Sequence, residues 1–194
     1  MADGLKDALA SRRTVRDFSP EPVSPEALSR LIWAAQGITG EDGKRTAPSA
    51  HGLCPLHLRV AVGRVDGLET GLYSVSRETG ALEKIGAQDV RGALSDAAIG
   101  EQPWVGEAAC IVTICADFVA PCRDFADQPP YGRRGERYVH IEAGCAAQNM
   151  LLQAAADGLG GVLVAGFLDE ATGAVLGLSA PLSPVLHLCL GLPA

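Results

Sequence analysis

The chain has 194 residues, of which 47% are hydrophobic and 20% charged, and its formal net charge is −7. This length suits a single domain over residues 1–194, and the composition is that of a globular protein rather than a disordered one. The acidic balance disfavours nucleic acid and anionic membranes as partners, and the sequence contains neither a signal peptide nor a long apolar run. We therefore expect a cytoplasmic protein with a small-molecule partner.

The first predicted elements are two helices. Residues 5–11 are expected to form a short helix that stops near Arg12. A firmer helix is predicted over 24–37, with Ser24 as the N-cap, Pro25 at the first helical position and Gly37 ending it in the left-handed conformation. Its apolar residues recur at helical spacing and predict one buried stripe, formed by Leu28, Leu31, Ile32 and Ala35.

The middle of the chain is expected to alternate loops, strands and one helix. Residues 39–48 are polar and glycine-rich, which is typical of a loop. Residues 57–63 predict a strand, and residues 71–75 and 81–85 predict a hairpin around the turn at 78–80. Residues 88–99 are expected to be helical, and the apolar, β-branched run at 108–116 predicts a buried central strand.

The longest predicted helix spans residues 136–157 and is apolar nearly all round. Such a helix must be covered on every side. We expect the core to cover one face and a second subunit of a homodimer to cover the other. Glycines at 158–160 end this helix, and the remaining prediction is a strand at 161–167, a short helix at 169–178 and a final strand at 185–190.

These elements predict an α+β fold in which helices flank a mostly antiparallel central sheet. A doubly wound parallel sheet fits less well because the pattern includes a hairpin. The glycine-rich run at 158–166 could be mistaken for a dinucleotide-binding motif. That motif lies between a strand and a helix, whereas these glycines lie between a helix and a strand, so we exclude it.

Two segments are candidates for binding a ligand. Residues 12–16 carry three arginines, Arg12, Arg13 and Arg16, beside the hydroxyl of Thr14. Such a cluster can bind a phosphate, or it can be a solvated basic turn. Residues 46–56 form a turn of small residues, which allows backbone amides to approach a planar ligand or simply forms a loop. Local sequence leaves both alternatives open.

Other polar residues give weaker signals. The six cysteines match no metal-binding spacing and are expected to be reduced thiols, so no metal site is predicted. The four histidines have no serine or cysteine partner at a recognisable spacing, and we interpret them as structural or exposed. Glu142 and Tyr138, in the long predicted helix, are interpreted as packing or interface groups.

Taken together, the segments resemble the nitroreductase-like flavoproteins, and most closely their SagB-type branch, which includes peptide azoline dehydrogenases. The resemblance covers nearly the whole chain. It is carried by the order and spacing of motifs that are individually weak: SRRTVRDF at 11–18, LIWAAQG at 31–37, TAPSA at 46–50, GLY at 71–73, YGRRGERYVHIEAG at 131–144, QN at 148–149, GLG at 158–160 and VAGF at 164–167.

The resemblance implies an FMN site shared between two subunits. By its motifs, Arg12, Arg13 and Thr14 would hold the FMN phosphate and ribityl chain, and Arg16 would lie near the pyrimidine edge of the flavin. A loop that usually reaches the flavin from the other subunit, and a segment whose backbone N–H meets flavin N5, complete the implied site. The loop residues are Pro48, Ser49, Ala50, Gly52 and Leu53, and the N5 segment is Val164, Ala165 and Gly166. The helix at 136–157 would be the dimer helix.

The implied activity is a ping-pong reaction. NADH or NADPH would pass a hydride to FMN, and a nitroaromatic, quinone or enone would then take the electrons. No residue is assigned as catalytic, because the flavin carries the redox chemistry. A flavin-binding sensor or carrier without turnover and a peptide azoline dehydrogenase remain alternatives.

Two departures from the family pattern matter. No basic residue stands near the C-terminus to hold the phosphate, which leaves this role to the arginines at 12, 13 and 16. Pro130 precedes Tyr131 where azoline dehydrogenases tend to have a lysine, and this disfavours azoline oxidation because that step needs a base.

Overall fold

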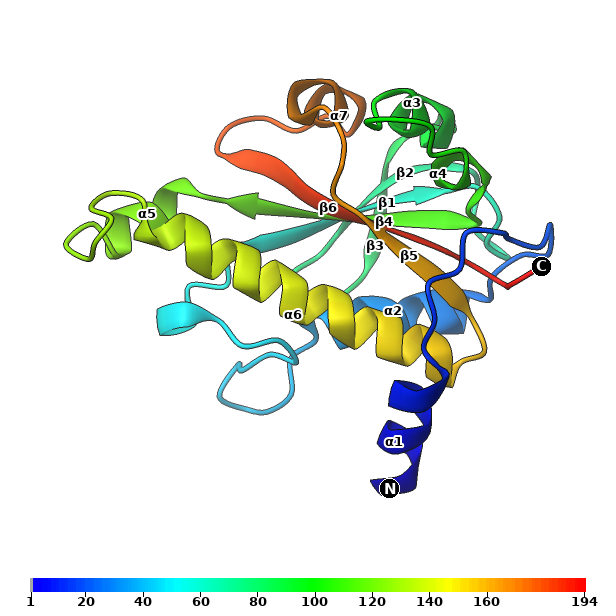
Figure 1. Cartoon of the computed structure of the whole chain (residues 1–194), viewed down its shortest axis with the longest axis horizontal. Coiled ribbons are helices and arrows are strands. Elements are labelled where there is room, and N and C mark those ends of the chain that lie inside the picture. The colour runs from blue at the N-terminus through cyan, green and yellow to red at the C-terminus, as the bar shows by residue number, and fades with distance from the viewer. Residues whose placement is uncertain (1) are drawn as a thin grey trace.

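The structure, a computed structural model, describes residues 2–194, and within them the centre of the fold is one six-stranded antiparallel sheet (Figure 1). The strand order is β3-β2-β1-β4-β6-β5. The predicted α+β architecture is therefore confirmed. The strands are β1 Leu56–Val62, β2 Gly71–Val75, β3 Leu82–Gly86, β4 Cys110–Asp117, β5 Gly160–Val164 and β6 Leu182–Gly191.

Strand β4 is the most buried strand, as its apolar run predicts. It pairs with β1 on one side and β6 on the other, and every residue from Cys110 to Ala116 is buried. A strand with neighbours at both edges and helices over both faces is buried on both sides, so its residues need not alternate between apolar and polar. The predicted hairpin is also confirmed, because β2 and β3 pair antiparallel.

Helices cover both faces of the sheet (Figure 1). On one face α6 runs beside α1 and α2, and on the other lie α3, α4 and α7. Two separate groups of buried apolar side chains correspond to these two layers. The helices are α1 Ala2–Ser11, α2 Pro25–Gln36, α3 Arg91–Asp96, α4 Trp104–Glu107, α5 Val119–Asp124, α6 Arg134–Ala156 and α7 Asp169–Val175.

Helix α2 begins as its sequence predicts and ends differently. The Ala27 N–H donates to Ser24 Oγ at 3.2 Å, which is the expected N-cap. The prediction of a left-handed Gly37 is wrong, because its φ of −61° and ψ of 146° are extended. Glycine is required there for a different reason: a Cβ on Gly37 would lie 2.2 Å from the Trp33 ring. The chain passes directly beneath the indole.

Three elements are shorter than predicted. The helix expected over 88–99 is reduced to α3, since Asp89 Oδ1 accepts the Arg91 N–H at its start and Ala98 bridges to Phe167 beyond its end. Strand β5 ends at Val164 rather than at 167. The helix predicted over 169–178 ends at Val175. In each case the sequence pattern continues beyond the observed end of the element, where a turn or a tertiary contact takes over.

Helix α6 is buried along one face and exposed along the other. Val139, Ala143 and Met150 are fully buried against the sheet, whereas Ile141 is 56% exposed. Its ends match the predicted 136–157 within two residues. Among the described residues, no helix is both long and apolar enough to cross a membrane.

Candidate functional site

The arginine segment lies along the outer edge of β5. Thr14 forms a parallel bridge with Gly161, and the Val15 N–H donates to the Gly161 carbonyl at 3.1 Å. This close approach depends on Gly160, because a Cβ there would lie 2.7 Å from Val15. The glycines that follow α6 therefore also allow residues 14 and 15 to pack closely against the edge of the sheet.

Of the three arginines of this segment, Arg13 and Arg16 are exposed and Arg12 is half-buried. Arg13 is exposed, and its Nη1 donates to the carbonyls of Ala10 and Arg12 at 2.8 and 2.9 Å. The Arg16 guanidinium lies over the Trp104 ring, 5.1 Å from its centroid. Among the described side chains, no carboxylate forms an ion pair with Arg12, Arg13 or Arg16. Guanidinium groups without a carboxylate partner favour binding of an anion.

The chain leaves β5 through an exposed turn at 165–166. The Gly166 carbonyl accepts the Ile99 N–H at 2.8 Å and Gln102 Nε2 at 3.0 Å. The Ala165 and Gly166 N–H groups donate to no protein atom within residues 2–194. An exposed backbone donor of this kind is available to a ligand.

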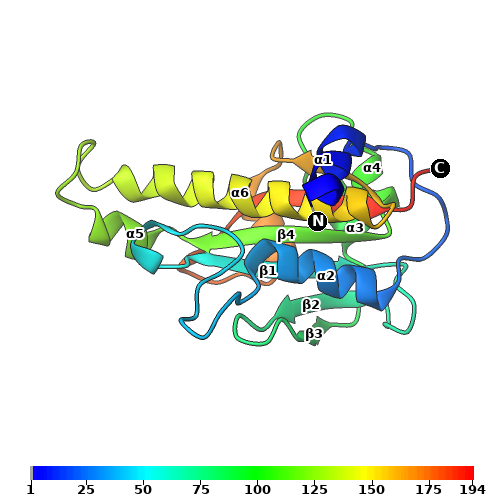
Figure 2. The ribbon, with the colours of Figure 1, turned by 90° about the horizontal axis from the view of Figure 1, so that it is seen from below.

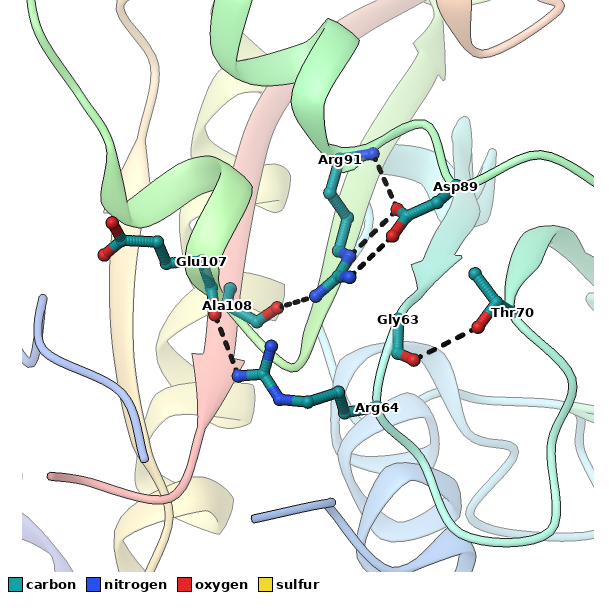
Figure 3. Close-up of polar contacts among 7 residues, drawn as sticks. All are labelled: Gly63, Arg64, Thr70, Asp89, Arg91, Glu107 and Ala108. Atoms are coloured by element: carbon teal, nitrogen blue, oxygen red, sulfur yellow. Dashed lines mark hydrogen bonds and ion pairs between the residues drawn. The ribbon is translucent and has the colours of Figure 1, made fainter. Parts of the chain in front are cut away.

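Two partly buried arginines, Arg64 and Arg91, hold the end of the helix that carries Trp104 (Figure 3). Arg91 donates to the Ala108 carbonyl and to both oxygens of Asp89, and its bonds to Asp89 lower the pKa of that carboxyl group. Arg64 Nη2 donates to the Glu107 carbonyl at 2.9 Å and also to the Ser19 carbonyl at 3.1 Å. The C-terminal end of α4 is thus tied to the loop that follows β1.

The predicted loop at 48–53 lies against α6 and is tightly held. The Ala50 N–H donates to Glu142 Oε1 at 2.6 Å, and the Cys54 N–H donates to Ser49 Oγ at 2.8 Å. Burial raises the pKa of Glu142, which the bonds from Ala50 and Ser49 partly oppose. Glu142 therefore fixes this loop, and its interpretation as a packing group agrees with that role.

This loop also contains unusual backbone conformations. His51 and Cys54 have φ values of 50° and 47°, and Gly52 has 67°. Such values are strained for residues other than glycine, by about 1–2 kcal/mol each. Strained residues persist where surrounding contacts fix them, and they concentrate at functional sites.

The two candidate regions lie at opposite ends of α6 in one chain (Figures 1 and 2). Loop 48–53 contacts α6 at Glu142, whereas residues 14 and 15 contact β5 just after α6 ends at Ala156. At 1.5 Å per helical residue this separation is roughly 20 Å. Residues 12–16 and 164–166 share one region, and residues 48–53 do not join it. A single protomer therefore does not assemble the whole predicted site.

Several residues near these regions were not found by sequence reasoning. Trp104, the first residue of α4, contacts Arg16, and Gln102, just before α4, contacts Gly166. Asp124 contacts His51 from α5. The contacts of Trp104 and Asp124 join residues more than 70 positions apart in the sequence. No local motif marks them.

Comparison with known proteins identifies the class. The fold is similar to that of a nitroreductase-type structure from Ralstonia eutropha, with a TM-score of 0.81 and 28% identity over 98% of this chain and 83% of that one. A second such structure, from Anabaena variabilis, gives a TM-score of 0.79 and 25% identity over 98% of this chain, which spans 38% of the other. These matches define a nitroreductase-like fold.

The sequence comparison gives the family. Residues 9–192 match the model of the Nitroreductase family, and the chain belongs to that family of oxidoreductases. A protein of Methanocaldococcus jannaschii that carries the provisional name nitroreductase is 37% identical over 166 residues, or 86% of this chain and 80% of that protein. A chain of the Escherichia coli microcin synthetase complex shares the fold alone, at 21% identity and a TM-score of 0.74.

Proposed function

We propose that this protein is a homodimeric FMN-dependent oxidoreductase that uses NADH or NADPH to reduce a small organic acceptor. The observation that carries the proposal is the group of unpaired arginines beside the exposed donors at the end of β5, in a chain of the Nitroreductase family. Bound FMN would supply hydride transfer in two half-reactions, first from the nicotinamide and then to a nitroaromatic, quinone or enone.

The arginine segment suits the phosphate end of FMN. Arg12, Arg13 and Thr14 are consecutive residues, and in the proposed complex the two guanidinium groups and the Thr14 hydroxyl bind a phosphate dianion. Arg13 is already turned toward its own backbone, so phosphate binding would exchange bonds to the Ala10 and Arg12 carbonyls for stronger charged ones.

Arg16 and the turn at 165–166 suit the ring end. In the proposed complex Arg16 stabilises negative charge at the pyrimidine edge, and its position over Trp104 limits its movement. The unused N–H groups of Ala165 and Gly166 are donors for N5, beside Val164. These protein groups orient the cofactor and adjust its electronics, and no side chain is needed for the hydride step itself.

A dimer supplies the missing half of the site. The proposed interface includes the exposed face of α6 and large apolar side chains on α1 and α2; Leu5 is 58%, Leu9 54%, Trp33 53% and Ile141 56% exposed. A twofold axis across α6 would bring Pro48, Ser49, Ala50, Gly52 and Leu53 of one copy toward the arginine segment of the other. The two regions, which lie roughly 20 Å apart within one chain, would then form one site shared between the two subunits.

The first test is flavin content. Purified protein, with FMN added if colourless, should bind about one FMN per subunit, and NADH or NADPH should bleach its visible band under anaerobic conditions. Absence of FMN binding would overturn the proposal. Binding without nicotinamide oxidation would instead indicate a flavin carrier or sensor.

A subunit-mixing experiment tests the shared site. One variant carries Arg12→Gln and Arg13→Gln, and the other carries Glu142→Ala, which releases loop 48–53. Each homodimer should bind FMN poorly, whereas unfolding and refolding the two together should restore about one good site per heterodimer. If mixing restores no binding, both halves of the site come from the same chain and the dimer arrangement is wrong.

A further inference from the structure

A histidine–aspartate pair lies in the middle of loop 48–53. The distance between His51 Nδ1 and Asp124 Oδ2 is 2.7 Å, and the two side chains are 65% and 37% exposed. The imidazole also packs on Phe125, with ring centroids 4.5 Å apart. Nδ1 is therefore committed to a carboxylate while the exposed ring leaves Nε2 available to another molecule.

The other histidines lack this arrangement. His187 is completely buried in the core, and burial lowers its pKa to about 4. His57 lies half-buried on β1, and His140 is exposed on α6; neither forms an ion pair among the described residues. The sequence alone favoured a structural or exposed role for every histidine, and His51 is the one whose geometry argues for chemistry.

The backbone supports the same conclusion. His51 has a φ of 50°, a conformation that glycine adopts without strain, and its neighbour is Gly52. This strained conformation is held by the Ala50–Glu142 hydrogen bond on one side and the Ser49–Cys54 hydrogen bond on the other. A glycine would fit this turn with less strain, so the imidazole is not required by the local backbone.

We propose that His51 is the proton donor for the acceptor in the second half-reaction, acting across the dimer interface, and that Asp124 is its positioning residue. This inference rests on the proposed function, which places loop 48–53 beside the flavin of the partner subunit. A quinone that gains a hydride also needs a proton on oxygen. The charged and titratable groups that face His51 or its turn are Asp124 from α5 and Glu142 and Tyr138 from α6.

The step balances without any further reactant. The N–H bond at His51 Nε2 breaks and an O–H bond forms on the acceptor, while the hydride and its electron pair originate from NADH or NADPH. The imidazole becomes neutral, with Nδ1–H still donating to Asp124, and a proton from water restores it. The net reaction consumes one nicotinamide, one acceptor and one proton.

The test separates the two half-reactions in the FMN-loaded dimer by stopped flow. In His51→Gly, bleaching by NADH should be unchanged and re-oxidation by 1,4-benzoquinone should slow about 10²-fold, the low end for general acid catalysis. Re-oxidation by ferricyanide, which takes electrons without a proton, should be unchanged. Cys54→Gly is the matched control, because it relieves a similar φ of 47° without removing the imidazole.

The pH profile distinguishes a proton donor from a structural residue. The rate of the quinone step in the wild type should fall with rising pH, because the step consumes a proton, and should show a solvent isotope effect in D2O. Both features should disappear in His51→Gly, and Asp124→Asn should weaken them.

A readout independent of turnover is the ¹⁵N shift of the His51 ring. The neutral ring should be protonated at Nδ1 in the wild type and at Nε2 in Asp124→Ala. Equal quinone rates in wild type and His51→Gly would overturn the inference while leaving the proposed function intact. Absence of FMN binding in the wild type would overturn the proposed function itself.

Discussion

The two halves of the proposed flavin site are held in different ways. Loop 48–53 is fixed by a buried carboxylate, Glu142, and contains residues in strained conformations. Segment 12–16 is held by an edge bridge to β5, and its arginines form no ion pair among the described side chains. The first half is a rigid frame, whereas the second keeps its charges free for an anion. Rigidity and charge are thus supplied by separate parts of the chain.

The largest expected effect comes from the charged half. Replacing Arg12 and Arg13 together by Gln should weaken FMN binding about 10²- to 10⁴-fold, because hydrogen bonds to charged groups contribute about 1.5–3 kcal/mol each. Titration of FMN fluorescence measures this, and riboflavin, which lacks the phosphate, should lose much less affinity.

The same arginine substitutions should leave the free energy of unfolding of the apo-protein within about 0.5 kcal/mol, since these side chains lie at the surface. Lys44→Gln with Lys84→Gln removes two positive charges elsewhere and is the matched control for net charge. An equal loss of FMN affinity in this control would mean that overall charge, not a phosphate site, governs binding.

The rigid half should respond in the opposite way. Glu142→Ala leaves the Ala50 N–H without its acceptor in a partly buried position, and the apo-protein should lose about 2 kcal/mol of unfolding free energy. Urea denaturation measures this loss. A variant as stable as the wild type would show that the loop is not held by this carboxylate.

Glu142→Gln keeps an acceptor oxygen and removes the buried charge. Because burial raises the pKa of Glu142, the folded state binds this proton more tightly than the unfolded state does. The stability of the wild type relative to the variant should therefore fall as pH rises from the ordinary glutamate range through the raised pKa. Urea melts at a series of pH values test this, and a constant difference between the two proteins would contradict it.

The smallest effect isolates backbone strain in the loop. Gly52→Ala should cost about 1 kcal/mol, because φ is 67° while the added Cβ would meet no atom within 4 Å. Gly92→Ala in α3 is the matched control, since its Cβ is equally unobstructed in a helix, and it should gain about 0.5–1 kcal/mol. The midpoint of thermal unfolding should fall in Gly52→Ala and rise in Gly92→Ala.

Much of the fold follows from the sequence because its signals are local. The buried run at β4, the Ser24 cap of α2 and the helical span of α6 depend on neighbouring residues, and the structure confirms them. Glycine at 37 was correctly placed at a helix end, but its reason was not local. The approach of Trp33, rather than a positive φ, requires it.

The sequence by itself determined the α+β class, the main elements and the clustering of Arg12, Arg13 and Arg16. Only the tertiary structure decided how the site is divided, since α6 keeps residues 12–16 and 48–53 at opposite ends of one chain. It also decided that Glu142 holds Ala50 and that Asp124 holds His51, contacts across 92 and 73 positions of sequence. Periodicity and capping describe neighbours along the chain, and such distant pairs exist only after the sheet and its helices have packed.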